Sequence, residues 1–359
     1  MEPSVARFPK NDIMTLTSET PRYDLAESIG PDLPLADLLD ASADDGLGEL
    51  ALSYGTAQGN PDLRALIAER HGVSPDDVVV TMTPSFPVAR NALDVVGANV
   101  RELTLTFDKG YRFDPDDLSG QLNKTTKLVF LASPQNPSGV SISREALHAV
   151  LALMEERCPD AYLLLDETYR EAAYGHEPVV PSAVGLSDKV ISCASLSKCH
   201  GAPGLRLGWA ITRDPDLREQ LVVGKFSTVI SCSAVDEALA CRVLQRRDRI
   251  IGERRLRLAD GLARTAAWVA AHETQVEWVR PDAGALCCLR LRREVFDEAA
   301  VDRFYDVLAG EGVRVASGLW FGEEARVFRL GFGLLPMEDL DKALAGLSKA
   351  VSQTARAAA

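Results

Sequence analysis

The sequence predicts an α/β fold: a large domain built on a mostly parallel sheet covered by helices, and a smaller α/β domain. The first reason is length, because a chain of 359 residues is too long for one small core. Short apolar runs alternate with amphipathic helical patterns through the middle of the chain, and strand-like runs return after Pro281. Buried strands separated by helices form crossover connections, which produce parallel sheets with helices on their faces.

Six apolar runs are expected to be strands of the large domain. They are short and rich in β-branched or long apolar residues. These runs are residues 76–81, 99–105, 127–133, 161–166, 189–195 and 204–212. Residues 143–158 lie between two of the runs and repeat apolar positions at helical spacing, with Ser143 placed to cap the helix.

Helical and strand-like patterns continue towards the C-terminus. Residues 235–272 are rich in arginine and have helical spacing, which predicts a long helix with a solvated basic face. Residues 285–291, 312–317 and 327–332 are predicted strands, with helices around them. These strands and helices indicate the smaller α/β unit.

The expected domain organisation has three parts. Residues 1–40 are rich in turn-forming residues, which predicts an N-terminal arm that crosses another surface and belongs to the small domain. Residues 41–274 are expected to form the large domain, and residues 275–359 the small C-terminal domain.

Composition argues against several classes of function. The chain has 39 basic and 52 acidic residues, a net charge of -13, so its surface should repel nucleic acid and anionic membranes. The seven cysteines and five histidines have no spacing typical of a metal site. The N-terminus lacks the apolar stretch of a signal peptide, and no run approaches the roughly 20 apolar residues that span a bilayer. We therefore expect a cytoplasmic protein with reduced cysteines and no metal.

Residues 195–209, SLSKCHGAPGLRLGW, contain the candidate catalytic lysine. Lys198 follows an apolar strand and precedes a Gly/Pro-rich turn, which places it at the carboxyl end of a strand, where α/β proteins bind ligands. A lysine that forms an imine must lose its charge near neutral pH, and burial favours this loss. The hydroxyls of Ser195 and Ser197 and the guanidinium of Arg206 suit a phosphate dianion. A lone lysine after a strand is more often a surface residue, but the whole set is more specific.

This SxSK pattern, followed by a Gly/Pro turn and GLRxGW, resembles the signature of the pyridoxal-phosphate (PLP) dependent aminotransferase class I/II family. The resemblance covers most of the chain from about Leu52 to Pro336. It implies the PLP transferase fold of type I and a Schiff base, or aldimine, between Lys198 and the cofactor pyridoxal 5'-phosphate. It also implies that Ser195 and Arg206, helped by Ser197, bind the cofactor's phosphate.

Two more motifs extend the resemblance to the cofactor ring. Asp166 ends an apolar run, and a carboxylate there can pair with a pyridinium nitrogen and keep it protonated. The family's DExY pattern implies this role for Asp166 and a hydrogen bond from Tyr169 to the ring's phenolate oxygen. In SPQNPSG, Asn136 matches the family's NPxG turn, which implies that its side chain also contacts that oxygen and lies beside the substrate.

Three further segments resemble family motifs. TPSFP places Phe86 where the family stacks an aromatic ring on the cofactor. LSYGTAQGNPDLRALIA places Tyr54 where the family's tyrosine reaches the phosphate bound by the neighbouring subunit, which implies a homodimer with shared active sites. VFRLGFG contains Arg329, whose rigid fork of donors suits a carboxylate, so Arg329 is the candidate for binding the substrate's α-carboxylate.

The chain departs from the family after residues 76–81. The family continues there with a glycine-containing loop and a helix whose N-terminus holds the phosphate. Here the run leads almost directly into TPSFP, so a piece of roughly 20 residues, about one crossover half-unit, is missing. The chain is a natural variant with a rebuilt phosphate site, or a shortened form with impaired activity, or MTPSFPVARNALDVVG supplies the helix itself.

The predicted function is that of an aminotransferase, which moves the amino group of an amino acid to a 2-oxo acid through the Lys198 aldimine. Lys198 is also the expected general base, with Asp166 and Tyr169 as its catalytic partners. One alternative keeps PLP and catalyses elimination, cyclisation or oxidation of an amino acid in a biosynthetic pathway. Another is a protein that retains the fold but binds PLP poorly because of the missing segment. The sequence does not identify the amino acid.

Overall fold

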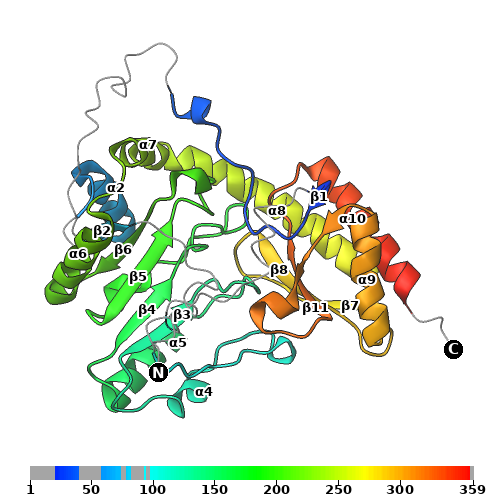
Figure 1. Ribbon diagram of the computed structural model, residues 1–359, viewed down its shortest axis with the longest axis horizontal. Helices are drawn as coiled ribbons and strands as arrows, with labels where there is room; N and C mark the ends of the chain where they lie inside the picture. Colours follow the sequence, from blue (N-terminus) through cyan, green and yellow to red (C-terminus); the bar gives the residue numbers. More distant parts are fainter. Residues whose placement is uncertain (1–20, 40–57, 74–77, 82–92, 94–97, 356–359) are drawn as a thin grey trace, which may run out of the picture.

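The computed structural model describes residues 21–39, 58–73, 78–81, 93 and 98–355. Its larger sheet has five strands in the order β2-β6-β5-β4-β3 (Figure 1). Their bounds are β2 Val78–Thr81, β3 Leu128–Ala132, β4 Tyr162–Asp166, β5 Val190–Ser195 and β6 Gly208–Thr212. Strands β3, β4 and β5 pair in parallel, and β6 is antiparallel to both β5 and β2. Four of the five strands therefore run in one direction, which confirms the mostly parallel sheet.

Helices pack against this sheet and begin where the sequence offers caps. In α5 (Arg144–Arg157) the hydroxyl of Ser143 accepts a hydrogen bond from the backbone of Ala146, which confirms the predicted N-cap. The Asn60 side chain caps α2 (Pro61–His71) in the same way. The other helices of this part are α4 Pro115–Ser119, α6 Pro215–Val229, α7 Ala234–Gln245 and α8 Arg247–Ala271, with 3-10 turns η2 Leu35–Asp37, η4 Phe107–Lys109, η5 Ala183–Leu186 and η6 Pro203–Leu205.

One predicted strand is wrong. Residues 99–105 form no strand, although Leu103 and Leu105 do pack against buried clusters. A strand needs a hydrogen-bonding partner, and within the described residues the sheet ends at β3. The apolar side chains of Leu128 and Phe130 on β3 are also exposed, at 38% and 37%. The alternation therefore indicated which residues are partly buried, but it predicted the wrong secondary structure.

The predicted long helix is also corrected. It divides at Arg246 into α7 and α8, because the backbone of Arg246 leaves the helical conformation there. Its basic face is not fully solvated either. Arg254 and Arg257 are half-buried and donate to the backbone carbonyls of Pro31 and of residues 333–335. Arginine can satisfy several carbonyls at once with its planar fork of donors, which a charge pattern cannot reveal.

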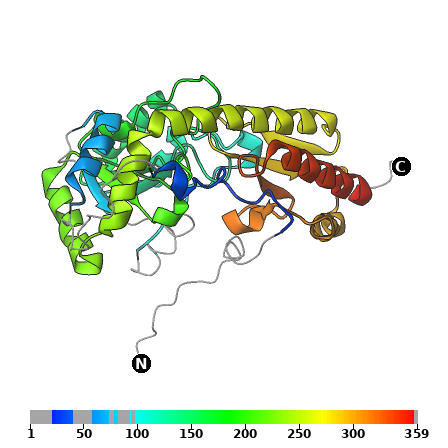
Figure 2. The same cartoon turned by 90° about the horizontal axis from the view of Figure 1, so that it is seen from above.

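The second sheet is antiparallel and has the order β10-β11-β8-β7. Its elements are β7 Val276–Val279, β8 Leu286–Leu291, β10 Ala316–Ser317 and β11 Val327–Gly331, with α9 Glu298–Gly310, η7 Gly318–Phe321 and α10 Met337–Thr354. Phenylalanines 296, 304 and 328 are fully buried in the cluster that joins this sheet to its helices. Figures 1 and 2 show α8 running from beside the larger sheet to this second sheet, so it connects the two parts.

The N-terminal segment joins both parts of the molecule. Strand β1 (Tyr23–Asp24) pairs in parallel with β9 (Val313–Arg314), beside the second sheet. The carbonyl of Leu25 then accepts a hydrogen bond of 2.6 Å from the backbone of Gly331 in β11. Eight residues later, the backbone of Leu33 donates to the carbonyl of Gly201, just after Lys198. The segment from residue 25 to residue 33 is therefore held at both ends, and it crosses the region where the candidate residues meet. The domain boundaries at residues 40 and 274 stay a prediction.

Candidate functional site

Most of the candidate residues meet at the carboxyl ends of the central strands. Asp166 is the last residue of β4, Ser195 is the last residue of β5, and Lys198 follows in the next turn. Strands β4 and β5 are parallel neighbours, so their carboxyl ends lie at the same edge of the sheet. In α/β proteins this edge is where ligands bind.

Lys198 has a perturbed amine. Its Nζ lies 3.3 Å from the hydroxyl of Ser28, to which it can donate. The pKa of Lys198 is lowered to about 8, mainly by burial; the charges of Arg329 and Arg206 contribute to the lowering, and those of Glu27 and Asp166 oppose it. A larger fraction of such an amine is neutral near pH 7 than of an ordinary, solvated lysine. The amine is therefore suited to act as a nucleophile or a base.

This shift predicts a pH dependence for chemical labelling. Only the neutral amine reacts with a small aldehyde, so labelling of Lys198 should reach half of its maximal rate near pH 8 and level off about one pH unit higher. Lys342 provides the control, because it is exposed and its bond to Asp339 raises its pKa. Its labelling should still be accelerating above pH 9. Reductive trapping and mass spectrometry of the two peptides would measure both rates, and equal pH profiles would contradict the perturbed amine.

Asp166 shares the space around Lys198. Its side chain is 9% exposed, and one carboxylate oxygen accepts a hydrogen bond from the backbone of Thr168 at 2.9 Å. Its charge raises the pKa values of both Lys198 and Tyr169, so the three groups lie within electrostatic reach of one another. Asp166 ends β4 and Lys198 follows β5, so both groups lie at the same edge of the sheet, as a single ligand between them would require.

A chain of hydrogen bonds links Lys198 to Arg329. The Ser28 hydroxyl lies 2.9 Å from the Tyr169 phenol, and the Asn136 amide donates to the same phenol at 3.4 Å. Arg329 donates to the Asn136 side chain at 2.8 Å. Burial raises the pKa of Tyr169 to about 12, so the phenol stays neutral and can donate to a ligand. Five side chains from separate parts of the chain thus form one polar surface.

Arg329 occupies β11 and is almost completely buried, at 1% exposure. It also donates to the backbone carbonyl of Ala26 in the N-terminal segment, and its guanidinium lies 4.9 Å from the centre of the Phe321 ring. Burial lowers the pKa of Arg329, and nearby Tyr169 and Glu27 oppose this shift. A buried guanidinium requires partners of this kind and readily binds a carboxylate.

A group of hydroxyl and guanidinium donors lies beside Lys198. Ser195 and Ser197 are buried, and the hydroxyl of Ser195 accepts from the backbone of Ser197 at 3.3 Å. Arg206 adopts the left-handed conformation, with φ 48°, and donates to the carbonyl of Pro203. Arg206 is exposed, and its positive charge contributes to the lowered pKa of Lys198, so the two groups lie within electrostatic reach of each other. These donors fit an anionic group next to the lysine.

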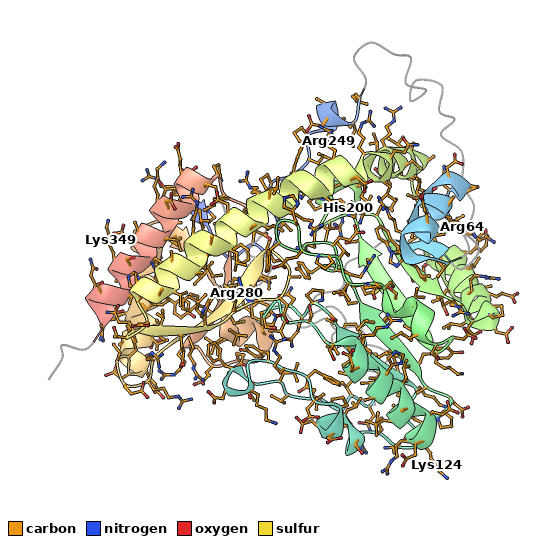
Figure 3. All side chains as sticks on the ribbon, turned by 180° about the vertical axis from the view of Figure 1, so that it is seen from behind. Arg64, Lys124, His200, Arg249, Arg280 and Lys349 are labelled. Carbon is orange, nitrogen blue, oxygen red and sulfur yellow. The ribbon has the colours of Figure 1, made fainter. Side chains whose placement is uncertain are left out.

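A buried ionic network supports the turn that carries Lys198. His200 lies 3.3 Å from Glu171, which also accepts from Arg247 at the start of α8 at 3.0 Å. Figure 3 labels His200 between α8 and the larger sheet. The sulfur of Cys199 donates to the carbonyl of Thr168, after β4. These contacts tie the turn after β5 to both β4 and α8, so the position of Lys198 is fixed from two sides.

Two candidate residues and one candidate segment lie outside the described residues. These are Phe86, Tyr54 and the run from residue 82 to residue 92, where the sequence departs from the family. Their roles stay predictions, as do the three explanations for that departure. Conversely, sequence reasoning missed Ser28 and Glu27 in the N-terminal segment. The turn-rich segment DLAESIGPDLP gave no signal beyond its composition, since both residues reach the site only through tertiary contacts.

Comparison with known proteins finds a family model, relatives and a solved structure that each match most of the chain. Residues 72–347 match the family model described as "Aminotransferase class I and II". The capreomycidine synthase of Streptomyces vinaceus is 29% identical over 334 residues, 86% of this chain and 84% of the relative. Histidinol-phosphate aminotransferase 1 of Mesorhizobium japonicum is 27% identical over 298 residues, 75% of this chain and 76% of the relative. A PLP-dependent aminotransferase from Streptococcus suis shares the fold, with a TM-score of 0.87, 23% identity and coverage of 98% of this chain and 100% of that chain.

Proposed function

We propose a function from one premise: this chain belongs to the aminotransferase class I and II family. It is a PLP-dependent transferase, and its reaction moves the amino group of an amino acid to a 2-oxo acid. What each side chain contributes to that reaction is our proposal. The observation that carries it is the perturbed amine of Lys198, which lies within electrostatic reach of Asp166 and is linked by hydrogen bonds to Arg329.

The residues present fit PLP by their chemistry. The cofactor offers an aldehyde, a pyridine nitrogen, a phenolic oxygen and a phosphate. Lys198 supplies an amine for the aldehyde, and Asp166 supplies a buried carboxylate for the nitrogen. The Asn136 amide donates a hydrogen bond to the Tyr169 hydroxyl, so the two side chains lie together. Both would donate to the phenolic oxygen of the cofactor. The donors for the phosphate would be Arg206 with residues 195 and 197. When bound, PLP supplies an electron sink that stabilises negative charge at the substrate's α-carbon.

Each residue then has a defined task in the transfer. Arg329 holds the substrate's α-carboxylate and so fixes the orientation of the α-carbon. The substrate's amino group would replace Lys198 at the aldehyde carbon of the cofactor. The freed amine of Lys198 would then take the proton from the α-carbon and later return a proton on the same side. Asp166 keeps a proton on the ring nitrogen, because its negative charge favours the protonated form. The neutral Tyr169 donates a hydrogen bond and helps to hold the ring in place.

A spectral titration tests this proposal. Protein loaded with PLP would be mixed with single amino acids in the absence of a 2-oxo acid. We expect the visible absorption of the bound cofactor to change with a preferred amino acid. One equivalent of 2-oxo acid per site should appear and turnover should then stop until a second 2-oxo acid is added. Loaded protein that responds to no amino acid would contradict the proposal.

A second candidate function is PLP-dependent cyclisation, and one comparison favours it. A solved structure described as a PLP-dependent cyclase is 26% identical to this chain, with a TM-score of 0.81 and coverage of 98% of this chain and 98% of that chain. A cyclising enzyme needs no amino acceptor, so it would convert many equivalents of amino acid per site without any added 2-oxo acid. The titration described above therefore separates the two candidates directly, by the number of equivalents consumed.

Assembly as a homodimer and a cytoplasmic location are further parts of the proposal. The C-terminal half of α6 exposes apolar side chains, with Phe226 58% and Val223 52% exposed, and Val229 and Ile230 continue this surface. Exposed apolar patches of this kind often form interfaces. The cysteines are free, as expected in a reducing compartment. Within the described residues, no helix has both the length and the apolar character needed to cross a bilayer.

A further inference from the structure

Glu27 lies between two residues that touch the site. The carbonyl of Ala26, on one side, accepts a hydrogen bond from Arg329. The hydroxyl of Ser28, on the other side, contacts both Lys198 and Tyr169. The Glu27 residue itself is half-buried, so its side chain is neither sealed in the core nor fully solvated.

The backbone of Glu27 is fixed against β11. A Cβ atom added at Gly331, two residues after Arg329, would collide with the carbonyl oxygen of Glu27. The backbone of Gly331 also donates to the carbonyl of Leu25 at 2.6 Å. Such close packing leaves the backbone of Glu27 little freedom to move away from Arg329, so the residue stays beside the site.

The charge of Glu27 acts on both cations of the site. It raises the pKa values of Lys198 and Arg329, so the carboxylate lies within electrostatic reach of each. Yet it forms no ion pair or hydrogen bond with either of them, or with any other side chain in the described part of the chain. Both cations also have other partners in the proposed reaction, namely the cofactor and the substrate's α-carboxylate. Once these are bound, a half-buried negative charge remains to be balanced.

We propose that Glu27 binds a positively charged group on the substrate's side chain, so that the preferred amino acid is arginine-like or lysine-like. This inference rests on the proposed function, since it needs the α-carboxylate to be held by Arg329. Ordinary amino acids with acidic side chains would bring a second negative charge next to Glu27, and neutral ones would leave its carboxylate unpaired. A guanidinium or ammonium is the group that balances it, with charge-assisted hydrogen bonds.

Paired substrates of equal shape provide the test. Arginine and citrulline differ in charge and have nearly the same size, and lysine and norleucine form a second pair. Half-saturating concentrations would be read from the absorption of the bound cofactor in the wild-type protein, in Glu27→Gln and in the control Glu156→Gln, which changes an exposed residue of α5. For arginine and lysine, Glu27→Gln should raise this concentration about 10- to 100-fold, as expected for losing a charge-assisted bond.

The outcomes separate this inference from the proposed function. For citrulline and norleucine, Glu27→Gln should change the half-saturating concentration by less than about 3-fold, and the control should match the wild type for all four compounds. The inference is overturned if the wild type binds each neutral compound as well as its charged partner, or if Glu27→Gln weakens all four equally. In both cases the absorption still responds to amino acids, so the proposed function survives. A loaded wild-type protein that responds to no amino acid overturns both.

Discussion

Replacing Lys198 by alanine should lower kcat/KM by at least about 10⁴-fold, because one side chain supplies both the attachment point for the cofactor and the base that moves the α-proton. General base catalysis alone accounts for roughly 10²- to 10⁴-fold. The visible absorption of the bound cofactor should also change, since no amine remains within reach of the aldehyde. Steady-state kinetics and the absorption spectrum of the loaded variant would measure the two effects.

Two control variants make this result interpretable. Lys198→Arg keeps the positive charge and most of the volume but offers no amine that can lose its proton, so it should fail like Lys198→Ala. Lys342→Ala removes an exposed lysine that is paired with Asp339 on α10, and it should retain full activity. If Lys198→Ala retained more than about a tenth of the wild-type kcat/KM, Lys198 would not be the base.

The central part of the fold was predictable because local pattern and tertiary context agree there. Residues 162–166 and 190–195 form buried strands of the sheet, and their apolar runs are continuous, as is typical of strands covered on both faces. The Ser143 cap was predictable for the same reason, since a hydroxyl before an apolar repeat satisfies the first helical N–H groups. In these elements no distant contact is needed to decide the structure.

The predictions that proved wrong concern segments whose structure depends on contacts with distant residues. Residues 99–105 alternate like a strand, but pairing requires a neighbour, and the described sheet ends at β3. The predicted helix over residues 235–272 breaks at Arg246, although its helical spacing continues across the break. The arginines of α8 looked like a solvated face until the structure placed backbone carbonyls against Arg254 and Arg257.

The candidate site shows the same division. Asp166 and Arg329 lie in strands, and Lys198 lies in the turn after β5. The course of a strand determines where its side chains lie, so the sequence motifs predicted these positions correctly. Ser28 and Glu27 lie in a segment without regular structure. They reach the site because Leu25 is hydrogen-bonded to β11 and Leu33 to the turn after β5. Such bridging contacts join residues more than 150 positions apart, and no local sequence pattern encodes them.

Replacing Arg329 by lysine should have the second largest effect, a loss of about 10²- to 10³-fold in kcat/KM. Lysine keeps the charge but offers one point of contact in place of a fork, so it cannot hold a carboxylate with two parallel bonds. It should also lose at least one of the two bonds that Arg329 makes, to Asn136 and to the carbonyl of Ala26. Most of the loss should appear in KM, because the α-carboxylate is bound before and during the reaction.

The control for this variant is Arg290→Lys in β8, the strand next to β11. Arg290 pairs with Glu277 and Asp108, and within the described residues no ion pair or hydrogen bond joins its side chain to Lys198, Asn136 or residues 21–33. Its replacement should leave KM within about 2-fold of the wild type. A second readout separates binding from folding, since the cofactor spectrum of Arg329→Lys should stay unchanged while amino acids bind weakly. If Arg329→Lys altered kcat alone, or if Arg290→Lys raised KM equally, then the carboxylate would be bound elsewhere, and the orientation of the substrate between Arg329 and Lys198 would have to be abandoned.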